Sequence, residues 1–160
     1  MQGRVARRIP ELLTVSRSSE VDIRKAFDVD KGAITTIPLG VDTDVFTADA
    51  APERVSGRIV RVASADAPLK GVSYLLEAVA KLGAEREVSL TLVSKLDPEG
   101  PSAKLIDDLA IRDRVSVVSG LEDAELAGLM ASAEVACVPS LYEGFSLPAV
   151  EAMSCSTPLV

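Results

Sequence analysis

The sequence contains no histidine, so it lacks the side chain that enzymes most often use as a base near neutral pH. Catalytic triads of the Ser-His-Asp type and Cys-His pairs are therefore excluded, because an imidazole must take the proton from the nucleophile. With only two cysteines and no histidine, a zinc site is also strongly disfavoured. Any chemistry must use carboxylates, lysine, arginine and backbone groups.

Positive charge and aromatic residues are both scarce. The formal net charge is −7, whereas a nucleic-acid-binding surface must be basic to contact phosphates. Aromatic residues make up 3% of the chain, which leaves few side chains on which bases could stack. The composition therefore predicts that nucleic acid is not a partner.

Long apolar runs are missing as well. No run approaches the ~18 residues that a membrane-spanning helix needs, and the N-terminal residues lack the apolar stretch of a secretory signal. The sequence predicts a cytoplasmic protein that is not transmembrane, and it leaves peripheral membrane association open. Cys137 and Cys155 lie among small or apolar residues, which predicts buried thiols rather than a disulfide.

From residue 58 onward, short β-branched runs alternate with segments of helical period. The expected strands are residues 58–63, 88–93, 114–118 and 134–138. The expected helices have apolar faces made of Val72, Leu75, Leu76, Val79 and Leu82, then Ala103, Ile106, Leu109 and Ala110, then Leu126, Leu129 and Met130. This alternation predicts an α/β fold with a Rossmann-like parallel sheet that has helices on both faces.

The first 46 residues follow a different pattern. Residues 12–15 and 33–37 are expected to form short strands, and Ser18 or Ser19 is expected to cap a helix that ends at Phe27. Residues 47–57, rich in Ala, Pro, Glu and Asp, are interpreted as a linker into a domain of residues 58–160. That domain stops at the beginning of a further strand, which indicates that it is incomplete at its C-terminus.

The most informative stretch runs from Glu143 to Glu151. Pro148 suits the first position of a helix, so residues 144–147 are expected to form a turn whose amides point outward beside the helix N-terminus. Such a turn attracts phosphate, and Gly144 allows the backbone to approach it closely. Since Glu151 can accept hydrogen bonds from sugar hydroxyls at the same place, the arrangement predicts a site for a phosphorylated sugar.

Structural interpretations of these residues stay open. Lys70 could be a solvated lysine, although a cation at a helix start is mildly unfavourable to the helix dipole. Glu151 could simply be an acid that stabilises a first helical turn. Glu143 lies in a loop, where the dipole gives it no such role. We favour function for all three.

In order and spacing, these motifs resemble the retaining GT-B glycosyltransferases of family 4. The matching residues are Ser16, the Ile-Pro-Leu-Gly-Val-Asp run at 37–42 with Phe46, Lys70-Gly71, Pro139-Ser140 and residues 143–153. The resemblance implies two Rossmann-like domains that face each other across a cleft. Residues 1–46 would then be the tail of the N-terminal domain and the inter-domain segment, and residues 58–160 the donor-binding domain. The missing N-terminal GT-B domain is an implied partner.

The resemblance also implies a role for each matching residue. The implied catalytic residues are Lys70, which neutralises the donor diphosphate, and Glu143, which lies beside the donor sugar. The implied donor-binding residues are Gly144, Phe145, Ser146 and Leu147 through their amides, Glu151 at the ribose hydroxyls, and Ser64. A nucleotide sugar is the implied substrate, with no cofactor and no metal.

The resemblance therefore implies a glycosyltransferase that moves a sugar from a nucleotide diphosphate to a carbohydrate, lipid or small-molecule acceptor, with retention. The isolated chain is expected to be inactive. A dinucleotide-dependent oxidoreductase is nearly excluded, because residues 63–68 lack the Gly-x-Gly-x-x-Gly turn. A non-catalytic interaction module of the same fold remains the alternative, because Ser64 stands where the family usually has a second diphosphate-binding arginine. Either Arg61 or a residue outside this sequence compensates for that arginine, or donor binding is weaker than is usual in the family.

Overall fold

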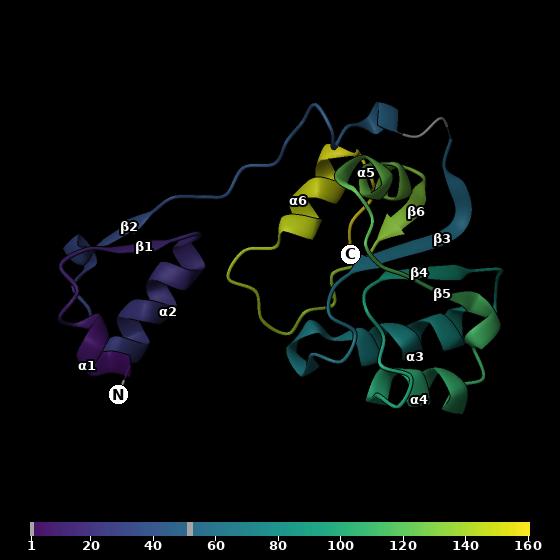
Figure 1. Ribbon diagram of the computed structural model, residues 1–160, viewed down its shortest axis with the longest axis horizontal. Helices are drawn as coiled ribbons and strands as arrows, with labels where there is room; N and C mark the ends of the chain where they lie inside the picture. The colour runs from purple at the N-terminus through teal and green to yellow at the C-terminus, as the bar shows by residue number, and fades with distance from the viewer. Residues whose placement is uncertain (1, 51–52) are drawn as a thin grey trace. The chain divides into compact units, whose positions relative to one another are not determined.

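The computed structural model describes residues 2–50 and 53–160 (Figure 1). The chain divides into two compact units. The first, here called the N-terminal unit, contains the residues up to Gly40 together with Glu143–Ser146. The second, here called the sheet unit, contains Val41–Tyr142 and Leu147–Val160.

The sheet unit is built on four parallel strands in the order β5-β4-β3-β6. The strands are β3 (Val55–Val62), β4 (Ser89–Val93), β5 (Val115–Val118) and β6 (Ala133–Ala136). The helices that connect and follow them are α3 (Val72–Leu82), α4 (Pro101–Asp108), α5 (Asp123–Ala131) and α6 (Leu147–Ser154). On the central strand, Ile59 pairs with Leu90 on one side and with Val135 on the other. The predicted parallel α/β fold is confirmed.

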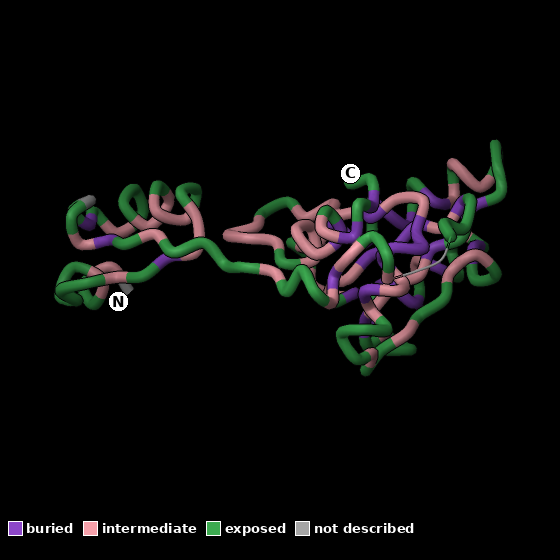
Figure 2. The backbone as a smooth tube through the Cα atoms, turned by 90° about the horizontal axis from the view of Figure 1, so that it is seen from above, coloured by how far each residue is buried: buried purple, intermediate pink, exposed green. Residues whose placement is uncertain are grey.

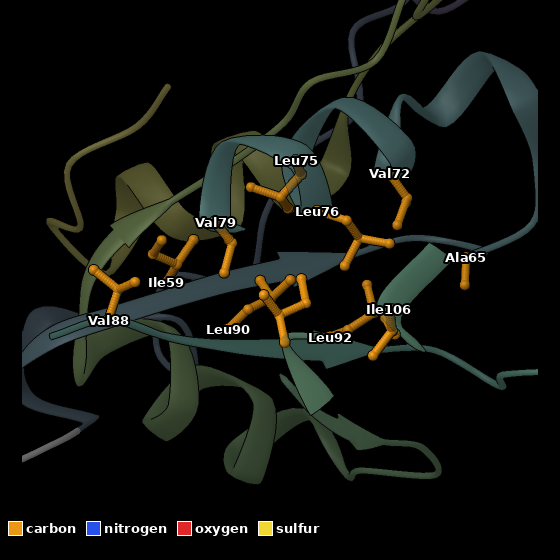
Figure 3. Packing of buried hydrophobic residues seen from close by; sticks show 11 residues of the cluster. Ile59, Ala65, Val72, Leu75, Leu76, Val79, Val88, Leu90, Leu92 and Ile106 are labelled. Atoms are coloured by element: carbon orange, nitrogen blue, oxygen red, sulfur yellow. The ribbon is translucent and has the colours of Figure 1, made fainter. Parts of the chain in front are cut away.

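Two apolar clusters cover the two faces of this sheet. On one face, Leu76 of α3 and Ile106 of α4 pack against Leu90 and Leu92 of β4, as Figure 3 shows. On the other face, the cluster is built by Ala127 and Met130 of α5, Ala152 and Cys155 at α6, and Val60 of β3. Buried positions are concentrated along these strands and helices (Figure 2). Helices therefore lie on both faces, as the alternating pattern predicts.

The prediction that Ala110 continues the apolar face of the second helix is wrong. The helix α4 stops at Asp108, and Ala110 is exposed with a left-handed φ of 53°. This turn places Ile111 in the core, where it is only 3% exposed. The chain thus leaves the helix in order to bury an isoleucine that the helical period does not include.

The start of β3 also differs from the sequence prediction. This strand begins at Val55, three residues before the expected start at Arg58 and inside the stretch interpreted as a linker. Upstream of it, the short 3₁₀ helix η2 (Ala48–Ala50) contacts α5. The division into domains at residues 46 and 57 stays a prediction.

The end of the chain lies beside β6. Leu159 forms an isolated parallel bridge with Ala136, at the place where the sequence predicts the beginning of a further strand. Both cysteines are free thiols; Cys155 is buried and Cys137 is half-buried. Within residues 2–50 and 53–160, no helix combines the length and the apolar character that crossing a membrane demands.

The N-terminal unit contains two helices and a two-stranded parallel sheet. Its elements are α1 (Gln2–Ala6), β1 (Leu12–Thr14), α2 (Arg17–Phe27) and β2 (Ile34–Thr36). The N-cap of α2 is Ser16, whose side chain accepts a 3.0 Å hydrogen bond from the backbone N–H of Ser19. The prediction of Ser18 or Ser19 as the cap is therefore wrong, because the extended backbone at Ser16 lets the helix begin earlier.

Replacing Ser16 with alanine is expected to lower the local stability of α2 by about 1 kcal/mol, because the Ser19 amide loses its partner. Native-state hydrogen exchange of the α2 amides measures this change. Ser18→Ala is the matched control, since Ser18 is exposed. Equal exchange in the two variants would contradict the assignment of the cap.

Candidate functional site

Two loops begin at the same edge of the sheet, because β3 and β6 are neighbours and run in the same direction. After β3, the chain passes Ser64, which is exposed, and reaches Lys70 at the end of the 3₁₀ helix η3 (Pro68–Lys70). After β6, it passes Pro139 and Ser140. Open parallel sheets bind ligands outside the carboxyl ends of their strands, so this edge is the expected place for a site.

The two loops are joined by direct contacts. The backbone N–H of Leu141 donates a 2.9 Å hydrogen bond to the carbonyl of Leu69. The Nη2 atom of Arg61 donates to the Oγ of Ser140 at 3.0 Å and to the carbonyl of Lys70 at 3.3 Å. We call residues 69–71 and 139–141 the loop junction. Its contacts fix the turn that carries Lys70 against the segment that leads to Glu143.

Gly71 lies at the closest approach in the loop junction. Its φ of 66° is left-handed, and a Cβ at this position would lie 2.0 Å from the carbonyl oxygen of Pro139. No side chain fits there, because real Cβ atoms do not come so close to a backbone oxygen. Gly71 is also the N-cap residue of α3, so the same close approach sets where this helix begins after Lys70.

Glu151, the residue predicted to bind the ribose, lies on α6. This helix begins at Leu147, which places Pro148 second rather than first. Glu151 is half-buried one turn later, and burial raises the pKa of its carboxyl group above the ordinary value of 4.5. The nearby carboxylate of Asp123, at the start of α5, raises this pKa further. Glu151 therefore resists ionisation, and a ligand hydroxyl that donates to the carboxylate would offset part of that cost.

The residues from Glu143 to Ser146 belong to the N-terminal unit. The carbonyl of Gly144 accepts a 3.4 Å hydrogen bond from Ser19 in the first turn of α2. Phe145 lines an open hollow of about 660 Å³ together with residues of α2 and β2, including Arg17, and with residues just outside these elements. The Oγ of Ser146 is buried, and among the described residues it has no hydrogen-bond partner.

The predicted site residues are thus described in two groups. The sheet unit contains Ser64, Lys70, Leu147 and Glu151, and the N-terminal unit contains Glu143, Gly144, Phe145 and Ser146. That Lys70 and Glu143 act on one ligand stays a prediction.

Across residues 2–50 and 53–160, no three carboxylate or thiol side chains are grouped so that they could hold a metal ion.

A small hollow of about 230 Å³ lies between the starts of α3 and α4. The Oδ1 atom of Asp66 accepts a 3.0 Å hydrogen bond from the N–H of Ser102 in the first turn of α4. The hydroxyl of Ser102 donates to the carbonyl of Ala65 at 2.9 Å. Because a protein carboxylate already occupies this helix N-terminus, the hollow is poorly suited to phosphate.

From the sequence alone, Arg61 is only a candidate substitute for the missing arginine. This arginine is 1% exposed on the central strand, where charged residues are rare. The signal available in the sequence was a charged residue between Val60 and Val62 in a run that otherwise reads as a buried strand.

A family model described as "Glycosyl transferases group 1" matches residues 56–160. The whole chain is 61% identical to the MMP alpha-(1->4)-mannosyltransferase of Mycolicibacterium hassiacum. The chain spans 38% of the length of that enzyme.

Solved structures also resemble the chain. The sucrose-phosphate synthase of Thermosynechococcus elongatus is 28% identical, with a TM-score of 0.79 over 99% of this chain and 42% of its own. The pneumococcal O-GlcNAc transferase GtfA, solved in complex with UDP and GlcNAc, is 21% identical, with a TM-score of 0.80 over 99% of this chain and 31% of its own. At that identity, the second likeness concerns the fold alone.

Gly71→Ala is expected to destabilise the sheet unit by at least about 3 kcal/mol. The new methyl group would clash with a backbone carbonyl, and alanine would also have to adopt an unfavourable left-handed φ. Gly120→Ala is the matched control. Its φ is 72°, but no atom lies within 4 Å of the added Cβ, so only the conformational cost of about 1 kcal/mol is expected. Urea unfolding measures both changes, and equal losses would contradict the close approach at Pro139.

Glu151→Gln is expected to change how stability depends on pH. A carboxyl group whose pKa is raised on folding stabilises the fold when it is protonated, and this contribution is lost as pH rises through the raised pKa. The variant should therefore gain unfolding free energy over the wild type at about pH 7.5, and the difference should shrink towards about pH 4. Urea unfolding at the two pH values measures it. A variant that is less stable than the wild type only at the higher pH would reverse the sign.

Proposed function

The chain belongs to the glycosyl transferases of group 1, and from this premise we propose that it is the donor-binding part of an enzyme that transfers a sugar from a nucleotide diphosphate to an acceptor with retention. The proposal covers the activity of the whole protein, of which these residues are one part. We propose that the 160 residues alone transfer no sugar, because acceptor contacts lie in the other GT-B domain.

The observation that carries the proposal is the identity of 61% over all 160 residues to a mannosyltransferase. The match spans the whole chain, including the segments that contain the predicted site residues. We therefore propose that the transferred sugar is mannose and that the new bond is an alpha-(1->4) linkage. The donor is then a nucleotide diphosphate mannose.

In the proposed mechanism, Lys70 stabilises the departing nucleoside diphosphate. The diphosphate gains negative charge as the glycosidic bond breaks, and a fixed cation lowers the energy of that state more than it lowers the ground state. The loop junction supports this role, because it fixes the turn that ends at Lys70. The family mechanism assigns charge neutralisation to such cations and to helix N-termini rather than to a metal.

The segment from Glu143 to Glu151 supplies the remaining donor contacts in the proposal. Backbone amides of residues 144–147 bind the sugar and phosphates at the N-terminus of α6. The buried hydroxyl of Ser146 supports this assignment, because a buried polar atom without a partner is costly until a ligand satisfies it. Glu143 contacts the donor sugar, and Glu151 accepts hydrogen bonds from the ribose.

The second candidate is a non-catalytic interaction module. It is favoured by one observation, the exposed Ser64 in place of an arginine that would contact the diphosphate. A module of this kind would keep the fold and tolerate replacement of both proposed catalytic residues.

The two candidates are separated by Lys70→Ala and Glu143→Gln in the full-length protein, with nucleotide diphosphate mannose as donor. Each variant is expected to lose at least about 100-fold in kcat/KM, as is typical when a group that stabilises transition-state charge is removed. Lys81→Ala, on the exposed end of α3, is the control and should retain wild-type activity. Transfer assays and the anomeric configuration of the product provide the measurements. Wild-type rates in both site variants would overturn the enzyme proposal.

A further inference from the structure

Arg61 occupies an unusual position for a charged residue. It lies on the central strand β3 and is 1% exposed, between the core residue Val60 and the partly buried Val62. Burying a guanidinium group is costly unless hydrogen bonds replace those it made to water. A buried arginine at the carboxyl edge of the sheet therefore needs a reason beyond packing.

The hydrogen bonds of Arg61 connect two separate loops. Its Nη2 atom donates to the hydroxyl of Ser140 in the β6 loop and to the carbonyl of Lys70 in the β3 loop. The planar guanidinium group presents several donors in fixed directions, so it can hold both acceptors at once. A lysine ammonium at the end of a flexible chain does not impose the same geometry.

Other contacts meet at the same place. The two loops that Arg61 connects also touch each other directly. Leu141 donates a hydrogen bond to Leu69, and Gly71 closely approaches Pro139. At 1% exposure, the guanidinium group does not offer a surface that a diphosphate could contact directly. It is therefore not a simple replacement for the arginine that is absent at Ser64.

We propose that Arg61 is a positioning residue for the donor site: its paired hydrogen bonds hold Lys70 and the segment leading to Glu143 in the arrangement that binds the diphosphate. The inference rests on the proposed function of Lys70 and Glu143. It predicts that loss of Arg61 weakens donor binding without removing any group that touches the donor.

The charge of Arg61 also acts on a neighbouring thiol. Burial raises the pKa of Cys137, and the positive charge of Arg61 opposes that rise. Removing the charge should therefore raise the thiol pKa further and slow alkylation of Cys137 at a given pH. This gives a local electrostatic readout at the junction that does not depend on sugar transfer.

The test uses the full-length protein with Arg61→Met and the matched control Arg58→Met. Arg58 lies on the same strand, and its Nη1 atom bonds the hydroxyl of Ser132 at 2.8 Å, in the same way that Arg61 bonds Ser140. Calorimetry with GDP and with UDP gives the dissociation constant of whichever nucleotide binds the wild type. Hydrogen exchange at the amides of Lys70 and Leu141 reports the loop junction itself.

Arg61→Met is expected to raise that dissociation constant about tenfold, a loss in keeping with two hydrogen bonds to a charged group. It should also accelerate exchange at Leu141, while Arg58→Met changes neither quantity. Ser140→Ala should produce smaller changes in the same direction, because it removes one of the two acceptors. If Arg61→Met fails to fold, Ser140→Ala carries the comparison with the same expected direction.

Wild-type affinity and exchange in Arg61→Met or, failing that variant, in Ser140→Ala would overturn the inference. Equal losses in the Arg61 and Arg58 variants would also overturn it, because the effect would then be general destabilisation. If neither nucleotide binds the wild type and no sugar is transferred, the proposed function fails. Exchange at Leu141 would still show whether Arg61 holds the junction.

Discussion

The structure of the site depends on how closely two neighbouring parallel strands let their loops approach. Since β3 and β6 end at the same edge, the chain after one strand meets the chain after the other at Gly71 and Pro139. This contact leaves no room for a side chain at Gly71. The buried guanidinium group of Arg61 donates hydrogen bonds to both loops. These contacts thus fix the backbone that carries Lys70.

Two groups of the sheet unit are costly to bury. Glu151 is half-buried near the carboxylate of Asp123, and Arg61 is almost fully buried. Groups that are costly to bury are concentrated at functional sites more often than elsewhere. Their presence at the carboxyl edge of the sheet agrees with a site that is completed by a polar ligand.

The fold could largely be predicted from the sequence, because periodicity reports which faces are buried. The apolar face of α3 was predicted correctly, since all of its members lie on one regular helix. Prediction failed at Ala110, where burial of Ile111 outweighs helical continuation, and at Ser16, where the cap depends on local backbone conformation. Neither the tertiary contact at Ile111 nor the extended backbone at Ser16 is visible in a pattern of residue types.

The candidate site was accessible to sequence reasoning only in part. The order of Lys70, Pro139 and the acidic pair led to the correct family, which the matching family model and the mannosyltransferase relative confirm. The role of Arg61 could not be predicted in the same way, because Lys70 and Ser140, to which it donates hydrogen bonds, are nine and 79 residues away. Such a connection exists only once the strands are paired.

The most direct measurement is a crystal structure of the full-length protein with a nucleotide diphosphate mannose. Our account predicts that the diphosphate contacts the Lys70 ammonium group and the amides of residues 144–147, with Glu151 at the ribose and Glu143 at the sugar. A donor bound elsewhere, or a diphosphate held without Lys70 and this turn, would contradict the account.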